Sequence, residues 1–101
     1  MIVITEFTEF EWDSGNKDKN LIRHNVTNQE AEEIFHNKPL PIFPDAVHST
    51  KNEIRYQAIG KTNSGKILFI SFTLRQEKVR IISARKADRK EEEIYAKKEK
   101  T

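Results

Sequence analysis

The chain has 101 residues, a length typical of one domain, and it contains no cysteine. Disulfide bonds, a thiolate nucleophile and the thiolate ligands of zinc are therefore excluded. No apolar run approaches the roughly 20 residues needed to cross a bilayer, and the first residues lack the basic start of a secretory signal peptide. We expect a soluble, cytoplasmic protein that forms one domain over residues 1–101 and has no membrane partner.

Charge is distributed unevenly along the sequence. Residues 1–50 contain four Lys or Arg and nine Asp or Glu, a net charge of −5, whereas residues 51–101 contain fourteen and seven, a net charge of +7. A basic half favours a polyanionic partner such as a nucleic acid. The alternative is that the two halves neutralise each other across the fold.

The first quarter of the chain predicts a strand and a short helix. A strand is expected over residues 3–12, where Phe10 and Trp12 alternate with polar residues and are assigned to core packing rather than to base stacking. Asp13 is the predicted N-cap of the first helix, because its short carboxylate can accept a backbone N–H of the first turn. Asn25 is expected to end that helix in the left-handed conformation.

A capping box predicts the second helix. Thr27 and Glu30 have the spacing of this motif, and the helix is expected to end near His36. Helical periodicity then assigns three residues to one buried stripe, namely Ala31, Ile34 and Phe35.

The remainder of the chain predicts an antiparallel sheet and a last helix. The prolines at 39, 41 and 44 confine the next segment to an extended edge or a loop. Three strand-like runs follow at residues 54–58, 67–73 and 79–85, joined by short links that predict a meander. Asp88 and Glu91 form a second capping box, which opens a helix over about 88–100 whose few apolar residues predict weak docking or movement. The fold class is α+β, with an antiparallel sheet, two short N-terminal helices and a C-terminal helix.

The candidate functional residues are mainly arginines. Arg75, Arg80 and Arg85 recur at five-residue intervals, and Arg55 lies on a neighbouring run. Guanidinium groups bind phosphate oxygens in pairs and stabilise the charge that develops on a phosphorane. Strand side chains alternate, so Arg80 and Arg85 are expected on opposite faces unless the strand bends or ends before Arg85. The alternative is that these arginines pair with carboxylates inside the protein, namely Asp13, Glu30 or Glu53.

His48 is the candidate for proton transfer. RNA cleavage without a metal needs a base for the ribose 2′-hydroxyl, an acid for the leaving 5′ oxygen, and cations beside the phosphate. His48 follows a proline-rich turn and precedes the strand of Arg55, and its unperturbed pKa of about 6.5 suits either role. The alternative is an exposed loop histidine. Glu53 is a possible second base, although we favour it as an arginine partner.

Other polar residues receive less specific assignments. His24 and His36 are interpreted as structural, and the three histidines, spaced 12 apart, lie in no metal-ligand motif. No glycine-rich phosphate loop is present, and no cofactor is expected. Three lysines near the arginines are predicted to contact an RNA backbone, namely Lys51, Lys78 and Lys86.

An ordered set of short motifs extends from residue 9 to residue 95. These motifs are FEWD at 10–13, NLIRHNV at 20–26, EA at 30–31 with Phe35, PDAVHS at 44–49, Arg55 with Gly60, and RIISARKA at 80–87. In this order they resemble the BrnT family of ribonuclease toxins. One departure is Asn25, where the family usually has glycine.

The resemblance implies a RelE-like fold and an endoribonuclease toxin that inhibits translation. It also implies a BrnA-like antitoxin with a ribbon-helix-helix part, through which the toxin would join operator DNA. The implied active face consists of His48, Arg55, Arg75, Arg80 and Arg85. The alternative function is a non-catalytic RNA-binding or antitoxin-partner module acting in operon autoregulation. Direct DNA recognition is disfavoured, because no helix-turn-helix pattern is present.

Overall fold

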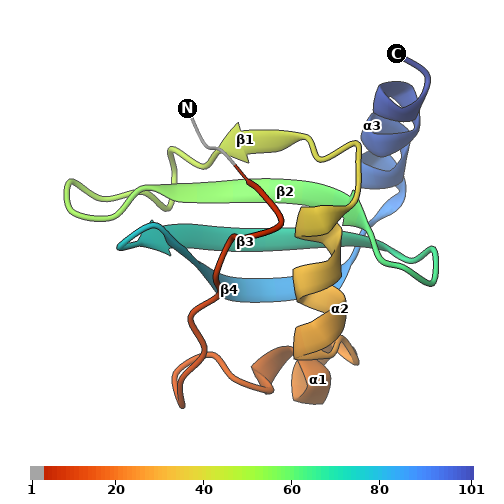
Figure 1. The fold of residues 1–101 in the computed structure, drawn as a ribbon. Helices are drawn as coiled ribbons and strands as arrows, with labels where there is room; N and C mark the ends of the chain where they lie inside the picture. The colour runs from red at the N-terminus through yellow and green to blue at the C-terminus, as the bar shows by residue number, and fades with distance from the viewer. Residues whose placement is uncertain (1–3) are drawn as a thin grey trace.

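The computed structural model describes residues 4–101 and has an α+β fold (Figure 1). Its helices are α1 (Lys19–His24), α2 (Asn28–Glu33), which continues into a 3₁₀ helix, η1 (Ile34–His36), and α3 (Arg89–Glu99). Its strands are β1 (Ile42–Pro44), β2 (Arg55–Lys61), β3 (Ile67–Arg75) and β4 (Lys78–Lys86). No helix among the described residues is long and apolar enough to span a membrane.

The four strands form one antiparallel sheet in the order β1-β2-β3-β4. The predicted meander is confirmed, and the proline-rich segment supplies the edge strand β1, as its prolines indicate. Gly65 makes the β2–β3 turn with a φ of +94°. The two residues between β3 and β4, Gln76 and Glu77, both have positive φ, as in the tight hairpin turns that usually contain Asn and Gly.

The main hydrophobic core lies between the sheet and the segment formed by α1, α2 and η1, which crosses one face of the sheet (Figure 1). The predicted capping box of Thr27 and Glu30 is present. Ala31, Ile34 and Phe35 are 0–3 % exposed, so the predicted stripe is confirmed. They pack in one cluster with alternate residues of the strands, namely Ala58, Leu68, Ile70, Phe72, Val79, Ile81 and Ala84.

The predicted N-terminal strand is wrong for the residues that the structure describes; the prediction began at residue 3, and residues 1–3 lie outside them. Within residues 4–12, the backbone pairs with the outer edge of β4 only through a parallel bridge between Phe10 and Val79. Beyond the bridge, side chains occupy that edge instead of a strand: Asn16 Nδ2 donates to the Ile81 carbonyl oxygen, and the Ala84 amide donates to Asn20 Oδ1. These bonds satisfy edge groups that a longer strand would otherwise pair.

The core assignments for the N-terminal aromatic residues are confirmed. Phe10 packs edge-to-face on Phe35, with ring centroids 5.6 Å apart. Trp12 packs partly buried against the core, and its Nε1 donates to Glu32 at 2.6 Å.

The first helix differs from the prediction at its start and agrees at its end. It begins at Lys19, so Asp13 is not its N-cap. The Asp13 carboxylate instead accepts from the Gly15 amide and from Arg80, because a guanidinium lies within its reach. Asn25 ends the helix in the left-handed conformation with a φ of 56°, as predicted.

The last helix, α3, matches the predicted range, and its capping box is present. Tyr95 is 1 % exposed, whereas Ile94 is 40 % exposed, so a single apolar side chain anchors the helix. Its last turn lies near the end of β2, where Lys61 Nζ is 2.8 Å from Glu99 and 5.6 Å from the centre of the Tyr95 ring. We call the sheet face opposite α1 and α2 the open face; α3 borders one end of it.

Candidate active site

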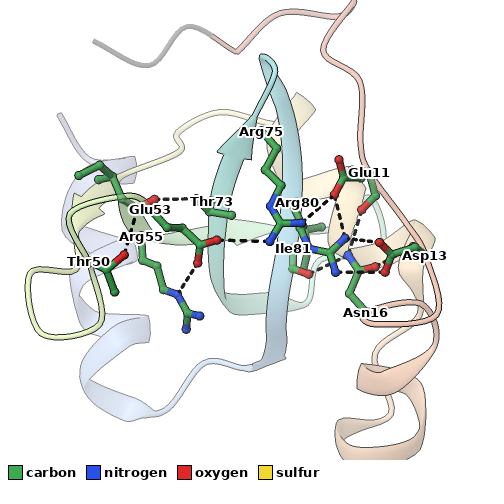
Figure 2. A network of polar contacts seen from close by, with 11 residues as sticks. Glu11, Asp13, Asn16, Thr50, Glu53, Arg55, Thr73, Arg75, Arg80 and Ile81 are labelled. Carbon is green, nitrogen blue, oxygen red and sulfur yellow. Dashed lines mark hydrogen bonds and ion pairs between the residues drawn. The ribbon is translucent and has the colours of Figure 1, made fainter.

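Three arginines lie at one end of the open face, the end away from α3. Arg55 on β2 lies opposite Thr73 on β3, which in turn lies opposite Arg80 on β4. Arg75 is two residues beyond Thr73 and therefore has the same orientation. We call Arg55, Arg75 and Arg80 the arginine cluster; Figure 2 shows their side chains in one row across the sheet.

Carboxylates alternate with the guanidinium groups along this row (Figure 2). Glu53 lies between Arg55 Nε at 3.2 Å and Arg75 Nη2 at 3.4 Å. Glu11 lies between Arg75 Nη1 at 3.5 Å and Arg80 Nη1 at 2.9 Å. The row is therefore close to neutral, with its positive charge screened by its own carboxylates.

Asp13 completes the row on the far side of Arg80. Its two oxygens accept from Arg80 Nη1 at 2.9 Å and Nη2 at 3.1 Å, a two-point contact. The predicted internal pairing of arginines with Asp13 and Glu53 is thus confirmed. The predicted pairing with Glu30 is wrong, since Glu30 binds Lys66 at 2.8 Å.

A β-bulge in β4 changes the predicted orientation of the last two arginines. Ser71 lies opposite Ser83 and Phe72 lies opposite Ile81, so β4 contains one extra residue at this point. The extra residue reverses the alternation, and Arg80 and Arg85 lie on the same face. The expectation of opposite faces is wrong, although the prediction allowed for a bend in the strand.

Arg85 shares the face but not the cluster. It lies opposite Phe69, four residues from the partner of Arg80, which is about 13 Å along the strand. Its guanidinium stacks 4.4 Å from the centre of the Phe69 ring and forms two hydrogen bonds with Glu91 of α3, at 2.8 and 2.9 Å. Arg85 therefore connects α3 to the sheet.

His48 lies in the loop over residues 45–54, which joins β1 to β2. Its side chain is 62 % exposed, and its Nδ1 is 2.8 Å from Oδ2 of Asp45. Within residues 4–101, no ion pair joins His48 to the arginine cluster. The loop is nevertheless attached to Arg55, because the Asp45 amide donates to the Arg55 carbonyl oxygen and the Arg55 amide donates to Ser49 Oγ.

Hydrogen bonds lower the pKa of three carboxylates of the site, namely Asp13, Asp45 and Glu53. The Arg80 side chain and then the Gly15 amide lower the pKa of Asp13, and Arg55 lowers the pKa of Glu53. Burial would raise the pKa of Asp45, but the hydrogen bonds from His48 outweigh it and the pKa is lowered. The Asp13 carboxylate in turn raises the pKa of Arg80. At neutral pH all four groups are therefore charged.

The remaining predicted residues lie outside the arginine cluster. Lys51 and Lys86 are exposed, and Lys78 Nζ is 3.5 Å from Glu9. His24 lies in the last turn of α1, and His36 stacks edge-to-face on Phe10 at 5.9 Å. Both positions agree with the structural interpretation of these two histidines.

Two carboxylates and one asparagine were not identified as site residues from the sequence. Glu11 and Asp45 belong to the site, and the available signals were the outward position of Glu11 between Phe10 and Trp12 and the three-residue spacing from Asp45 to His48. Asn16 was also missed; it is 3 % exposed and ties the segment of Asp13 to β4. An asparagine in a polar segment carries no periodic signal.

A hollow of about 220 Å³ lies beside the arginine cluster and is lined in part by Arg55, Thr73, Arg75 and Arg80. A larger hollow of about 890 Å³ lies between the N-terminal segment, the loop after η1 and the end of α3, and none of the predicted catalytic residues lines it. Among the described residues, no group of three or more His, Asp or Glu side chains is arranged to hold a metal ion.

Comparison with known families decides the assignment. The model of the family described as the ribonuclease toxin BrnT of type II toxin–antitoxin systems matches residues 12–91. The chain belongs to this family. A comparison with curated proteins gave no match.

Family membership identifies the chain as a ribonuclease toxin whose substrate is RNA and whose partner is an antitoxin. The matched range contains the arginine cluster, Arg85 with its partner Glu91, and the loop of His48. Glu11 precedes it by one residue.

Proposed function

We propose that the chain is an endoribonuclease that cleaves RNA without a metal ion, by attack of a ribose 2′-hydroxyl on the adjacent phosphate. In this reaction the 2′ oxygen gives its proton to a base and bonds to phosphorus. The bond to the 5′ oxygen breaks, and that oxygen takes a proton from an acid. His48 transfers one of the two protons, and the arginine cluster stabilises the charge on the phosphorane.

The observation that carries this proposal is the convergence of three guanidinium groups on one sheet face, next to a loop that presents a histidine. Arg55 connects the histidine loop to the arginine cluster. Its backbone forms hydrogen bonds with Asp45 and Ser49, and its side chain belongs to the cluster. An RNA phosphate would compete with Glu11, Asp13 and Glu53 for the same donors. Arg85 lies too far along the strand for the same phosphate, so we assign it to the flanking RNA backbone, together with Lys51, Lys78 and Lys86.

The biological setting follows from the same proposal. The toxin would inhibit translation in the cytoplasm, and a BrnA-like ribbon-helix-helix antitoxin would neutralise it and bring it to operator DNA. We further propose a RelE-like arrangement of one domain over residues 1–101. A partner that covers α3 would compensate for its single apolar anchor.

The test is RNA cleavage in the presence of EDTA. We expect the wild type to cleave, and His48→Ala and Arg80→Ala to lose about 10²–10³-fold in kcat/KM. Arg89→Ala is the matched control, because Arg89 is 93 % exposed and lies on α3. Thermal unfolding of each variant verifies the fold. Full activity in both site variants would refute this site, and loss of wild-type cleavage in EDTA would refute metal independence.

The second candidate is a module that binds RNA or the antitoxin without cleaving. It is favoured by one observation: each arginine of the cluster has a carboxylate partner, as in a purely structural network. Under this hypothesis RNA remains intact after incubation with the wild type, and binding weakens steeply with salt. The same cleavage assay therefore distinguishes the two candidates.

A further inference from the structure

We propose that Asp45 is a positioning residue for His48, which keeps the imidazole proton on Nδ1 so that Nε2 is the atom that exchanges protons with the substrate. The role in cleavage rests on the proposed function above. The position of the imidazole proton does not rest on that function, and it can be measured without RNA.

The Asp45 carboxylate holds His48 at two points. Oδ2 lies 2.8 Å from Nδ1 of the ring, and Oδ1 accepts the backbone amide of His48 at 3.2 Å. A charged carboxylate has no proton to give, so Nδ1 must be the donor in this contact. The hydrogen bond at one ring nitrogen determines the state of the other, and Nε2 of the neutral ring is left as an acceptor.

The carboxylate is itself held in place. Asp45 is 8 % exposed, whereas the His48 side chain is 62 % exposed, so the anchor is buried and the ring projects into solvent. Gln57, which points to the open face from β2, donates to Oδ2 at 3.3 Å. Ser49 Oγ donates to the Asp45 carbonyl oxygen at 2.6 Å and accepts the Arg55 amide at 2.9 Å, which closes the loop onto β2.

Among the described residues, no other carboxylate contacts the His48 ring. The remaining charged side chains of the loop and of the start of β2 are Lys51, Glu53 and Arg55. Lys51 is exposed, and Glu53 is bound to Arg55 and Arg75. Asp45 is thus the charged group in contact with the ring, and it would stabilise the imidazolium that forms when Nε2 takes a proton.

The first experiment is ¹⁵N NMR of the imidazole at a pH where His48 is neutral. We expect the proton on Nδ1 in the wild type, which is the minor form of free histidine. In Asp45→Asn the amide can donate to Nδ1, so we expect the proton on Nε2 in most molecules. Asp18→Asn is the matched control, because it removes one carboxylate from the turn before α1 and should leave His48 unchanged. A proton on Nε2 in the wild type would overturn the proposal. This outcome is measured on the wild type alone, so it does not depend on whether a variant folds.

The second experiment is steady-state cleavage. We expect kcat of Asp45→Asn to fall at least about tenfold with KM within about twofold, since the substrate contacts remain and the proton-exchanging atom is lost. Unchanged kcat in Asp45→Asn, in a protein where His48→Ala is inactive, would overturn the positioning role. An inactive wild type would overturn the proposed function, and the NMR result would still decide where the proton lies.

Discussion

The helix-covered face of the sheet and the arginine end of the open face are built from alternate residues of the same strands and are stabilised in opposite ways. On the helix-covered face, Phe72 and its neighbours are 0–1 % exposed and pack against α2 and η1. On the open face, Arg55, Arg75 and Arg80 are held by carboxylates that are partly exposed to water. Packing contributes more to stability than exposed ion pairs do. The arginine end of the open face can therefore rearrange around a ligand at small cost to the fold.

The largest effect is expected from truncation on the packed face. Phe72→Ala should destabilise the fold by about 3–5 kcal/mol, because Phe72 is fully buried between Phe35 and Tyr56. Its neighbour on the open face, Ser71→Ala, should change stability by less than about 0.5 kcal/mol. Urea unfolding measures both. Similar losses in the two variants would contradict the contrast between the faces.

The next effect concerns the close approach of η1 to β2. A Cβ added at Gly60 would lie 2.7 Å from Ile34 Cβ and 3.2 Å from Leu40 Cδ1. Because Ile34 Cβ is close to backbone and cannot rotate away, Gly60→Ala should cost about 1–3 kcal/mol. Chemical denaturation tests this, and an unchanged midpoint would show that η1 can move away from the sheet.

The packed face was largely predictable from the sequence because its signals are local. The capping box of Thr27 and Glu30, the left-handed Asn25 and the short turns each depend on residues within a few positions. The N-terminal strand was predicted wrongly because strand pairing is not local. Its alternation is real, but Asn16 and Asn20 occupy the β4 edge that a strand would need.

The open face was predictable in residue type but not in arrangement. Arginines in a basic half and a histidine near them indicate phosphate chemistry. The convergence of Arg55, Arg75 and Arg80 depends on how β2, β3 and β4 pair, and the face of Arg85 depends on one extra residue in β4. Arg85 was grouped with the other arginines because the family resemblance implied it, whereas it lies farther along the strand and binds Glu91 on α3.

A smaller effect is expected at the hairpin that joins the strands of Arg75 and Arg80. Gln76 and Glu77 have φ of 51° and 67°, a conformation that is unfavourable for side chains other than Asn, Asp and Gly. The double change Gln76→Asn and Glu77→Gly should stabilise the fold by about 1 kcal/mol, because Asn-Gly suits this turn. Glu77→Gln is the control, since it removes the charge and keeps the strain. Equal stability of both variants would contradict the strain argument.

The carboxylates of the row should weaken RNA binding. In a His48→Ala background, which leaves the RNA intact, Glu11→Gln or Asp13→Asn should raise affinity about threefold by freeing guanidinium donors. Each freed cation should steepen the slope of log K against log salt by about 0.7 for single-stranded RNA. Glu92→Gln on the exposed side of α3 is the control. Weaker binding in the row variants would indicate that these carboxylates position the arginines for RNA.

The smallest effect is the response of the open face to acid. The pKa values of Asp13 and Glu53 are lowered in the folded protein by their arginine partners. The unfolded chain therefore takes up protons first as the pH falls, and the stability contributed by the two groups is present above their usual pKa values of about 4 and lost below them. Asp13→Asn should flatten the decline of stability between about pH 5 and pH 3, measured by urea unfolding, whereas Phe72→Ala should shift the whole curve downward without changing its slope. A steeper decline in Asp13→Asn would mean that this carboxylate is destabilised, not stabilised, by its position beside Arg80.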